Sequence, residues 1–469
     1  MRIAWPWSLS ALEHGGFIAI GLLVYVLATR VGKQRRHPSA AIGWVLSIIA
    51  FPYVAVPLFL IFGTRKVARA RARAVRVAEA PVDAAAREHV PPWAAAALAA
   101  MHVEPPCRVG RVEFQSDGAQ ALRSLIALCD GAASTLAVQT FVFRNDAVGQ
   151  AAARALGAAA RRGVRTRLLV DGVGSAALPR GVVHQLRSAG VEVRSFMPLL
   201  HNPMRGRTNL RNHRKLAVAD GSVLWAGGRN LAIEYFVDSG GKRAWIDLGF
   251  TATGSLAASA QRQFDDDWLF AGGSSTSVGS DCRLEHVADS GGSWAQWVAS
   301  GPDRRDDTLH DLLMTAAYHA NQRILAVTPY FVPDDALLQA LLMAARRGVK
   351  VSLALPARSN HRLADIAREK SVRALVDAGA DVRLTPCMVH AKVLVIDEGV
   401  AMCGSLNLDG RSLFLNYEAM AVFYGRDEVQ WLAEWTRSLA ATGQPHPGGA
   451  PSLARDVLEG VVRAIGFQL

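Results

Sequence analysis

Apolar strand-like runs alternate with amphipathic stretches over most of the chain. Residues 135–170 contain an apolar run, an Ala-rich helical stretch and a second apolar run, and residues 323–355 repeat this order. Such alternation predicts an α/β fold with a buried sheet. The sequence Ala-Arg-Arg-Gly-Val ends the helical stretch in both segments, at 160–164 and 345–349. Its glycine suits the left-handed residue that often follows a helix.

The similarity continues beyond these segments. Each half goes on with a second helical stretch that ends on Ala-Gly and leads into a strand, at 188–196 and 377–384. Because order, spacing and helix-end signals all recur, we interpret the chain as one duplicated unit. A Gly- and Ser-rich segment at 272–293 is typical of a connecting loop. We therefore expect a first half at 106–293 and a second half at 294–469.

Two apolar segments precede the duplicated unit. Residues 15–29 are uncharged, and residues 38–63 carry no charged side chain. The second segment is long enough to cross a bilayer, which takes about 20 residues. Pro52 and Pro57 would kink it, so a re-entrant hairpin remains an alternative to a span. We predict two membrane-spanning or re-entrant segments within residues 1–65.

Basic residues flank both apolar segments. The larger cluster, at 65–76, opens a basic juxtamembrane linker that we place at 66–105. This asymmetry favours a cytoplasmic catalytic region, and the cluster also suits anionic headgroups. The net charge of +12 favours a polyanionic partner without distinguishing lipid from nucleic acid. The five cysteines form no CxxC or Cys/His cluster, which favours inert, reduced thiols.

Each half also contains a His-x-Lys-x4-Asp motif, and an asparagine follows 17 residues after each histidine. A histidine and a lysine two positions apart in a strand point to the same face, and the apolar run after each lysine predicts a buried strand. One copy would be a weak pattern, but two copies at matching offsets in a duplicated unit are a strong one. The candidate residues are His213, Lys215, Asp220 and Asn230 in the first half and His390, Lys392, Asp397, Ser405 and Asn407 in the second.

These paired motifs resemble the phospholipase D superfamily, whose two motifs meet in one active site. The resemblance implies two tandem α/β/α sandwich repeats with pseudo-twofold symmetry, preceded here by two N-terminal membrane helices. It also implies a phosphohistidine intermediate that needs no metal and no cofactor. Two lysines would neutralise the phosphate oxygens while one imidazole attacks phosphorus and the other protonates the leaving alkoxide. We favour His213 as the nucleophile and His390 as the acid/base, although the sequence leaves this assignment open.

The resemblance extends to supporting residues. Asp247 and Glu418 are candidates for orienting the two imidazoles. We expect Asp220 and Asp397, although part of the catalytic motifs, to fix the motifs' own architecture. Gly228 stands where the superfamily more usually has serine, and we expect the lost hydroxyl to weaken one phosphate contact. Hydrogen bonds to the phosphate or the histidines are expected from Asn230, Asn407 and Ser405.

Within the superfamily, the stretches KRAWIDL, TPYFVPDD and GSLNLDGRSLFLNYE are similar to those of bacterial cardiolipin synthases. This implies a membrane-bound phosphatidyltransferase that makes cardiolipin from two phosphatidylglycerol molecules and releases glycerol. The implied partners are phosphatidylglycerol and an anionic membrane surface, with no nucleic acid. The implied location is the bacterial inner membrane, crossed more than once, with the catalytic region in the cytoplasm. Phosphatidylethanolamine as the acceptor remains open.

Two other functions compete with this interpretation. One is a membrane-anchored phosphodiesterase of the same superfamily that hydrolyses phospholipid or nucleic acid. The other is a non-catalytic protein that binds anionic lipid, which the intact histidines and lysines of both motifs disfavour.

The sequence leaves two alternatives for the role of each of two further segments. An Arg-rich insert at 201–211 offers Arg205, Arg207 and Arg211 as headgroup contacts, with a solvated loop as the alternative. The tail at 451–469 has helical apolar spacing and is expected either to lie on the membrane or to pack on the core.

Overall fold

The computed structural model describes five stretches of the chain: residues 11–31, 38–63, 85–198, 209–274 and 292–464. Three predictions concern residues outside these stretches: the basic cluster at 65–76, the headgroup contacts of Arg205 and Arg207, and most of the connecting loop at 272–293.

The central feature is one 15-stranded sheet. The first half contributes β1 (Cys107–Gln115), β2 (Thr135–Thr140), β3 (Arg165–Asp171), β4 (Glu192–Phe196), β5 (Leu216–Ala219), β6 (Val223–Gly227) and β7 (Gly249–Gly254). The second half contributes β8 (Ser293–Ser300), β9 (Arg323–Val327), β11 (Lys350–Pro356), β12 (Asp381–Thr385), β13 (Val393–Ile396), β14 (Val400–Gly404), β16 (Glu418–Phe423) and β17 (Gln444–Pro445). A separate pair joins β10 (Phe331–Val332) to β15 (Leu408–Asp409).

The strand order confirms the duplication. From the centre outward, the first half runs β1-β7-β6-β5-β2-β3-β4, and the second half runs β8-β16-β14-β13-β9-β11-β12 before the short β17. Corresponding strands of the two repeats, such as β5 and β13, therefore occupy equivalent positions on the two sides of the sheet. The halves meet where β1 and β8 pair antiparallel, from Cys107 opposite Ala295 to Val109 opposite Ser293.

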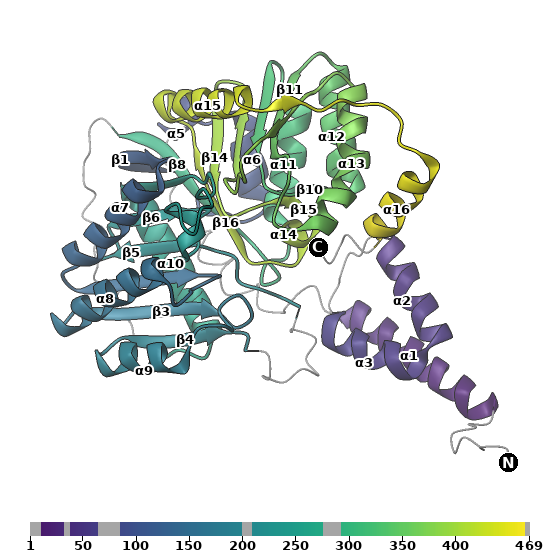
Figure 1. The fold of residues 1–469 in the computed structure, drawn as a ribbon, viewed down its shortest axis with the longest axis horizontal. Helices are drawn as coiled ribbons and strands as arrows, with labels where there is room; N and C mark the ends of the chain where they lie inside the picture. The colour runs from purple at the N-terminus through teal and green to yellow at the C-terminus, as the bar shows by residue number, and fades with distance from the viewer. Residues whose placement is uncertain (1–10, 32–37, 64–84, 199–208, 275–291, 465–469) are drawn as a thin grey trace.

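Helices cover both faces of the sheet, as the sequence predicts for an α/β fold (Figure 1). One face carries α10 (Ser255–Phe270) and α15 (Arg426–Ala441), whose apolar side chains share a single core that runs across both halves. The opposite face has a separate core in each half. Its helices are α7 (Gly118–Gly131), α8 (Ala147–Arg161) and α9 (Arg180–Ser188), then α11 (Thr308–His319), α12 (Asp335–Arg346) and α13 (Arg362–Asp377).

Local sequence explains where the repeated helices begin and end. Asp146 caps α8 by accepting hydrogen bonds from the amides of Val148 and Gly149 at 3.0 Å. Gly163 and Gly348, the glycines of the repeated Ala-Arg-Arg-Gly-Val sequence, follow α8 and α12 with φ of 90° and 91°. These values lie in the left-handed region that glycine adopts most readily, which confirms the predicted helix ends.

Five further helical elements of the described chain lie outside these two groups of helices. They are α5 (Ala86–His89), α6 (Pro92–Ala100), the 3-10 turn η2 (Ile233–Tyr235), α14 (Gly410–Phe414) and α16 (Leu453–Ala464).

Three helices form the N-terminal region: α1 (Ala11–Val31), α2 (Pro38–Ala50) and α3 (Pro52–Phe62). The second apolar segment is broken at Phe51, because Pro52 begins a new helix and cannot continue the preceding one. Pro57 lies inside α3. None of the helices in the described stretches combines the length and the apolar character needed to cross a membrane.

Candidate active site

Each motif histidine contacts the opposite half of the chain. Each histidine comes shortly before a buried strand, β5 for His213 and β13 for His390. The amide of His213 donates to the carbonyl of Tyr417 at 2.9 Å, and the amide of His390 donates to that of Ile246 at 2.7 Å. The backbone of each motif is therefore fixed by the other half.

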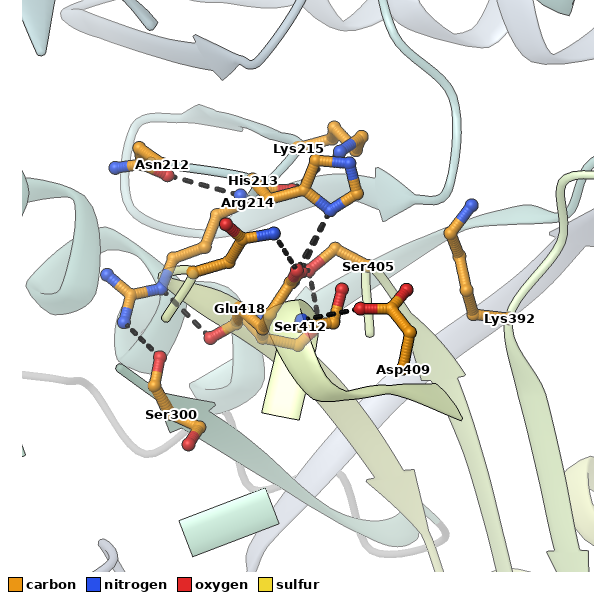
Figure 2. A network of polar contacts seen from close by, with 12 residues as sticks. Asn212, His213, Arg214, Lys215, Ser300, Lys392, Ser405, Asp409, Ser412 and Glu418 are labelled. Atoms are coloured by element: carbon orange, nitrogen blue, oxygen red, sulfur yellow. Dashed lines mark hydrogen bonds and ion pairs between the residues drawn. The ribbon is translucent and has the colours of Figure 1, made fainter. Parts of the chain in front are cut away.

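Each imidazole also pairs with a carboxylate from the other half. His213 Nδ1 lies 3.0 Å from Glu418 Oε1, and Figure 2 shows the two side chains pointing toward each other. His390 Nδ1 lies 2.7 Å from Asp247 Oδ2. A carboxylate at Nδ1 holds the ring orientation and the proton at that nitrogen, and so directs Nε2 toward the reacting group. The structure thus brings together the four residues expected to form two histidine–carboxylate pairs.

The motif lysines are buried beside these pairs. Lys215 Nζ donates to the His213 carbonyl at 2.6 Å, and Lys392 Nζ donates to the His390 carbonyl and lies 3.0 Å from His390 Nε2. Burial lowers the pKa of both amines, against the attraction of Glu418 and Asp247, and brings that of Lys392 to about 8. A buried lysine in its ammonium form favours an anion beside it, and a phosphodiester meets that requirement.

The charges of the four paired groups follow from burial and from their neighbours. Burial is the largest influence on the pKa of His213, which it lowers to about 4, and on that of His390, which it lowers to about 3. Burial alone would raise the pKa of Asp247 and Glu418, but the paired histidines and the nearby lysines outweigh it and lower both, Asp247 to about 2. Near neutral pH the unliganded site therefore holds two neutral imidazoles and two carboxylates.

The third motif residues lie at the far ends of β5 and β13. Asp220 accepts hydrogen bonds from the amides of Ala133, Ser134 and Thr135 at 2.7–2.9 Å. Asp397 accepts from the three corresponding amides at 321–323 at 2.8–3.0 Å. Both aspartates also occupy the left-handed region, with φ of 52° and 50°. The structure therefore places them as anchors of the turn after each motif strand, away from the imidazoles.

The expected polar supports hold other side chains in place. Ser405 Oγ donates to Glu418 Oε2, and so helps to hold in place the carboxylate that contacts His213. Asn230 accepts from the Val142 amide at 3.1 Å and donates to the Tyr235 hydroxyl at 2.9 Å. Asn407 is buried, and its Oδ1 has no hydrogen-bond partner among the described residues. Asn407 also forms a side-chain hydrogen bond with Asp409.

Gly228 needs a different explanation from the expected loss of a phosphate contact. It corresponds to Ser405, whose hydroxyl contacts the carboxylate of Glu418. A Cβ on Gly228 would lie 2.2 Å from Asp247 Oδ1, so this carboxylate fills the space that a side chain would take. Asp247 Oδ1 instead accepts from the Leu248 amide at 2.7 Å. The difference between the halves therefore concerns how each carboxylate is held.

Arg214 is a site residue that the sequence interpretation missed. It is fully buried and binds Asp267 through two hydrogen bonds of 2.6 and 2.7 Å. It also donates to the carbonyls of Glu418 and Ser300, each at 3.0 Å (Figure 2). Arg214 thereby fixes the backbone of the carboxylate that orients His213. The only sequence signal is that the first motif reads His-Arg-Lys, whereas the second has Ala391 in the middle.

Asp409 is a second residue that the interpretation missed. It is buried, accepts from the Ser412 amide at 2.8 Å, and lies between Ser412 and Lys392 in the view of Figure 2. Burial, together with the negative charge of Glu418, raises its pKa to about 7. The first half has Ala232 at this position, so the two sides of the site differ in charge.

Arg211 does not serve as the expected headgroup contact. Its side chain is buried, donates to the Met197 carbonyl at 2.9 Å and lies 3.4 Å from Asp171. Asp171 also accepts from the Asn212 amide at 2.9 Å. The charge of Arg211 is therefore used to hold the end of the insert against β3. Within the described stretches, no group of histidine, cysteine and acidic side chains is arranged to hold a metal ion.

Comparison with known proteins identifies the family of this chain. The family model described as "Cardiolipin synthase, PLD-like domain" matches residues 125–268 and 313–440. Cardiolipin synthase A of Pseudomonas aeruginosa (strain LESB58) is 32% identical over 460 residues, which cover 93% of both chains. That of Pseudomonas putida (strain W619) is 33% identical over 424 residues, covering 87% of this chain and 88% of its own.

A solved structure supports the fold independently. The crystal structure of phosphatidylserine synthase from Haemophilus influenzae Rd KW20 matches with a TM-score of 0.59 and 13% identity, covering 80% of this chain and 100% of that chain. At this identity the likeness concerns the fold alone. Together, the matched family model and the relatives over nearly the whole length establish that the chain belongs to the phospholipase D-like family of the cardiolipin synthases.

Proposed function

We propose that the protein is a phosphatidyltransferase that makes cardiolipin from two phosphatidylglycerol molecules and releases glycerol. The observation that carries the proposal is the pair of histidine–carboxylate contacts, each formed between the two halves, with a buried lysine beside each histidine. Membership of the cardiolipin synthase family supplies the substrate class.

In the first step, Nε2 of His213 attacks the phosphorus of one phosphatidylglycerol. The bond from phosphorus to the glycerol headgroup oxygen breaks, and His390 gives that oxygen a proton. Both imidazoles are neutral before substrate binds, so His390 must first take up a proton, which the anionic phosphate favours by raising its pKa. Lys215 and Lys392 offset the charge that builds on the non-bridging oxygens. The product is a phosphatidyl group on His213.

In the second step, a hydroxyl of the second phosphatidylglycerol attacks the same phosphorus. His390, now neutral, takes the hydroxyl proton, and the bond from phosphorus to His213 breaks. Cardiolipin leaves, His213 is again neutral, and His390 releases its proton to solvent once the anionic phosphate has gone. Glu418 stabilises the positive charge on the His213 ring in both steps, and Asp247 does the same for His390.

The membrane assignment belongs to the same proposal. We place the protein in the bacterial inner membrane through α1–α3, as two spanning or re-entrant segments, with the catalytic halves in the cytoplasm. Exposed apolar side chains such as Ile20, Leu46 and Val54 support a lipid environment for these helices. The break at Pro52 supports a re-entrant path for the second segment.

The test is to incubate the purified protein in detergent with phosphatidylglycerol and to follow cardiolipin, phosphatidic acid and glycerol by mass spectrometry. We expect cardiolipin and glycerol in equal amounts. Phosphatidic acid without cardiolipin would identify a hydrolase, and no turnover would point to a lipid-binding protein. A parallel reaction with added phosphatidylethanolamine, in which ethanolamine is also followed, shows whether this lipid takes part as a co-substrate.

The roles of the two histidines need a separate experiment. A donor lipid with p-nitrophenol as its leaving group departs without a protonated acid. His390→Ala should therefore still release one equivalent of nitrophenol and retain the phosphatidyl group on the peptide that contains His213, whereas His213→Ala should release none. The reverse pattern would exchange the two roles.

A further inference from the structure

The C-terminal helix α16 is held to the protein by one narrow face. Glu459 is buried and forms ion pairs with Arg373 of α13 and with Arg455 of its own helix. Val462 is also buried and packs against Val332 and Ala367. These contacts fix one face of α16 on α13. The other faces of α16 take no part in them.

The other face of α16 is apolar and exposed. Leu453 is 81% exposed, Val457 58%, Leu458 49% and Val461 62%. At about 100° per residue, these four side chains fall within an arc of roughly 140°, and Glu459 lies outside it. An apolar stripe of this width on a helix that already has a packed face is typical of a contact with lipid or with another protein.

The direction of α16 places this stripe at the edge of the sheet that carries the active site. Glu459 contacts Arg373, whereas Val462, later in α16, packs on Ala367, earlier in α13. Because Arg455, earlier in α16, also lies 3.3 Å from Glu369 of α13, the two helices cross at an angle. The contact of Val462 with Val332 and Ala367 places the later part of α16 beside the first half of α13. That end of α13 lies where β11 ends, at the same edge as His390, because β9 and β11 run parallel and β13 pairs antiparallel with β9.

The rim at the start of α13 adds positive charge to this surface. Arg358, Arg362 and Leu363 are exposed there, and Tyr330, which packs on His361, connects the rim to the segment before β10. Arginines next to an exposed leucine are complementary to a surface of anionic headgroups over hydrocarbon. A soluble partner protein would not require this combination beside a site for lipid substrates.

We propose that the apolar stripe of α16 and the basic rim of α13 form a bilayer-contact surface, separate from the N-terminal helices, that seats the active-site edge on anionic phospholipid. The inference rests on the proposed function for its choice of lipid as the occupant. It assigns α16 the task of bringing the mouth of the site to the headgroup layer, where phosphatidylglycerol is found.

The first test reads contact with lipid directly. The photoreactive residue benzoylphenylalanine is placed at Val457 or, as a matched control, at Asp456, in the full-length protein reconstituted in phosphatidylglycerol vesicles. We expect lipid adducts from position 457, and at least several-fold fewer from position 456. Adducts to a second protein chain, or equal labelling at the two positions, would overturn the proposal.

The second test reads the consequence for turnover. Val457→Ser/Val461→Ser should lower kcat/KM for phosphatidylglycerol in vesicles by about tenfold, because two apolar side chains no longer enter the bilayer. It should leave turnover of a short-chain, dispersed phosphatidylglycerol within about twofold, as should the control Asp456→Ser. An equal loss on both substrates would contradict the proposal. Failure of the proposed function is separable, since the unmodified protein would then make no cardiolipin from either substrate, whatever position 457 labels.

Discussion

The substitution Glu418→Gln tests whether the carboxylate from the second half stabilises charge on the histidine of the first half. Glu418 is fully buried, and its Oε1 lies 3.0 Å from His213 Nδ1. In the proposed first step, attack on phosphorus makes the His213 ring cationic, so the carboxylate would interact more strongly with the transition state than with the ground state. Glutamine has nearly the same shape, and its side-chain oxygen can still accept a hydrogen bond from Nδ1–H, so the substitution chiefly removes the charge.

The magnitude follows from the geometry. Two unit charges about 4 Å apart attract by about 4 kcal/mol at an effective dielectric constant of 20. The hydrogen bond kept by glutamine returns about 1 kcal/mol of this. A net loss of about 3 kcal/mol corresponds to a decrease in kcat on the order of a hundredfold. KM should change little, because the charge appears only during the reaction.

The assay is cardiolipin formation from phosphatidylglycerol in detergent micelles, with kcat and KM measured separately. Glu104→Gln is a suitable control, because Glu104 also forms an ion pair, with Arg262 at 2.8 Å, but lies outside the active site. It should leave kcat within about twofold. A decrease of less than fivefold for Glu418→Gln, or a change confined to KM, would refute the proposed electrostatic role.

Three further predictions concern other groups. Because burial lowers the pKa of Lys392 to about 8, its ammonium form is lost as the pH rises, and kcat/KM should fall above about pH 8. Lys392→Arg should move this alkaline limb of the pH–rate profile upward, and an unmoved limb would assign it to another group. Asp220→Asn should lower the free energy of unfolding by about 1–3 kcal/mol, because three backbone amides lose a charged acceptor. The pKa of Asp220 is lowered in the fold, so this difference should be present at neutral pH and vanish in acid, as thermal unfolding in detergent against pH would reveal. Arg214→Lys should lower kcat about tenfold by loosening the backbone of Glu418, whereas the buried control Arg167→Lys should not; equal losses would indicate a general packing effect.

The sequence predicted the repeated architecture and the residues of the histidine–carboxylate pairs. The repeat was visible because helix-end glycines and apolar strands recur in order, and both are local signals. Asp247 and Glu418 were found through the resemblance of their surrounding stretches. Which histidine each carboxylate contacts was not predicted, because that depends on how the two halves pack.

Other features depended on tertiary contacts that leave little trace in sequence. Arg211 lies in a basic segment that suggested an exposed loop, yet its guanidinium is buried in an ion pair with Asp171, 40 positions earlier. Arg214 was not singled out in the sequence, because its partner Asp267 comes from α10. Asp409 was not singled out in the sequence, because its burial, which raises its pKa to about 7, depends on tertiary packing. For both arginines the deciding partner lies far away in the sequence.

The exchange of partners between the halves has a consequence for how such a site is assembled. A single repeat carries a histidine whose carboxylate lies elsewhere, and a carboxylate whose histidine lies elsewhere. A protein built from one repeat would therefore be inactive alone and would gain activity only as a twofold dimer. In this chain the dimer is covalent, and its subunit interface is the seam between β1 and β8. Turnover of this chain therefore also reports whether its two halves have packed against each other.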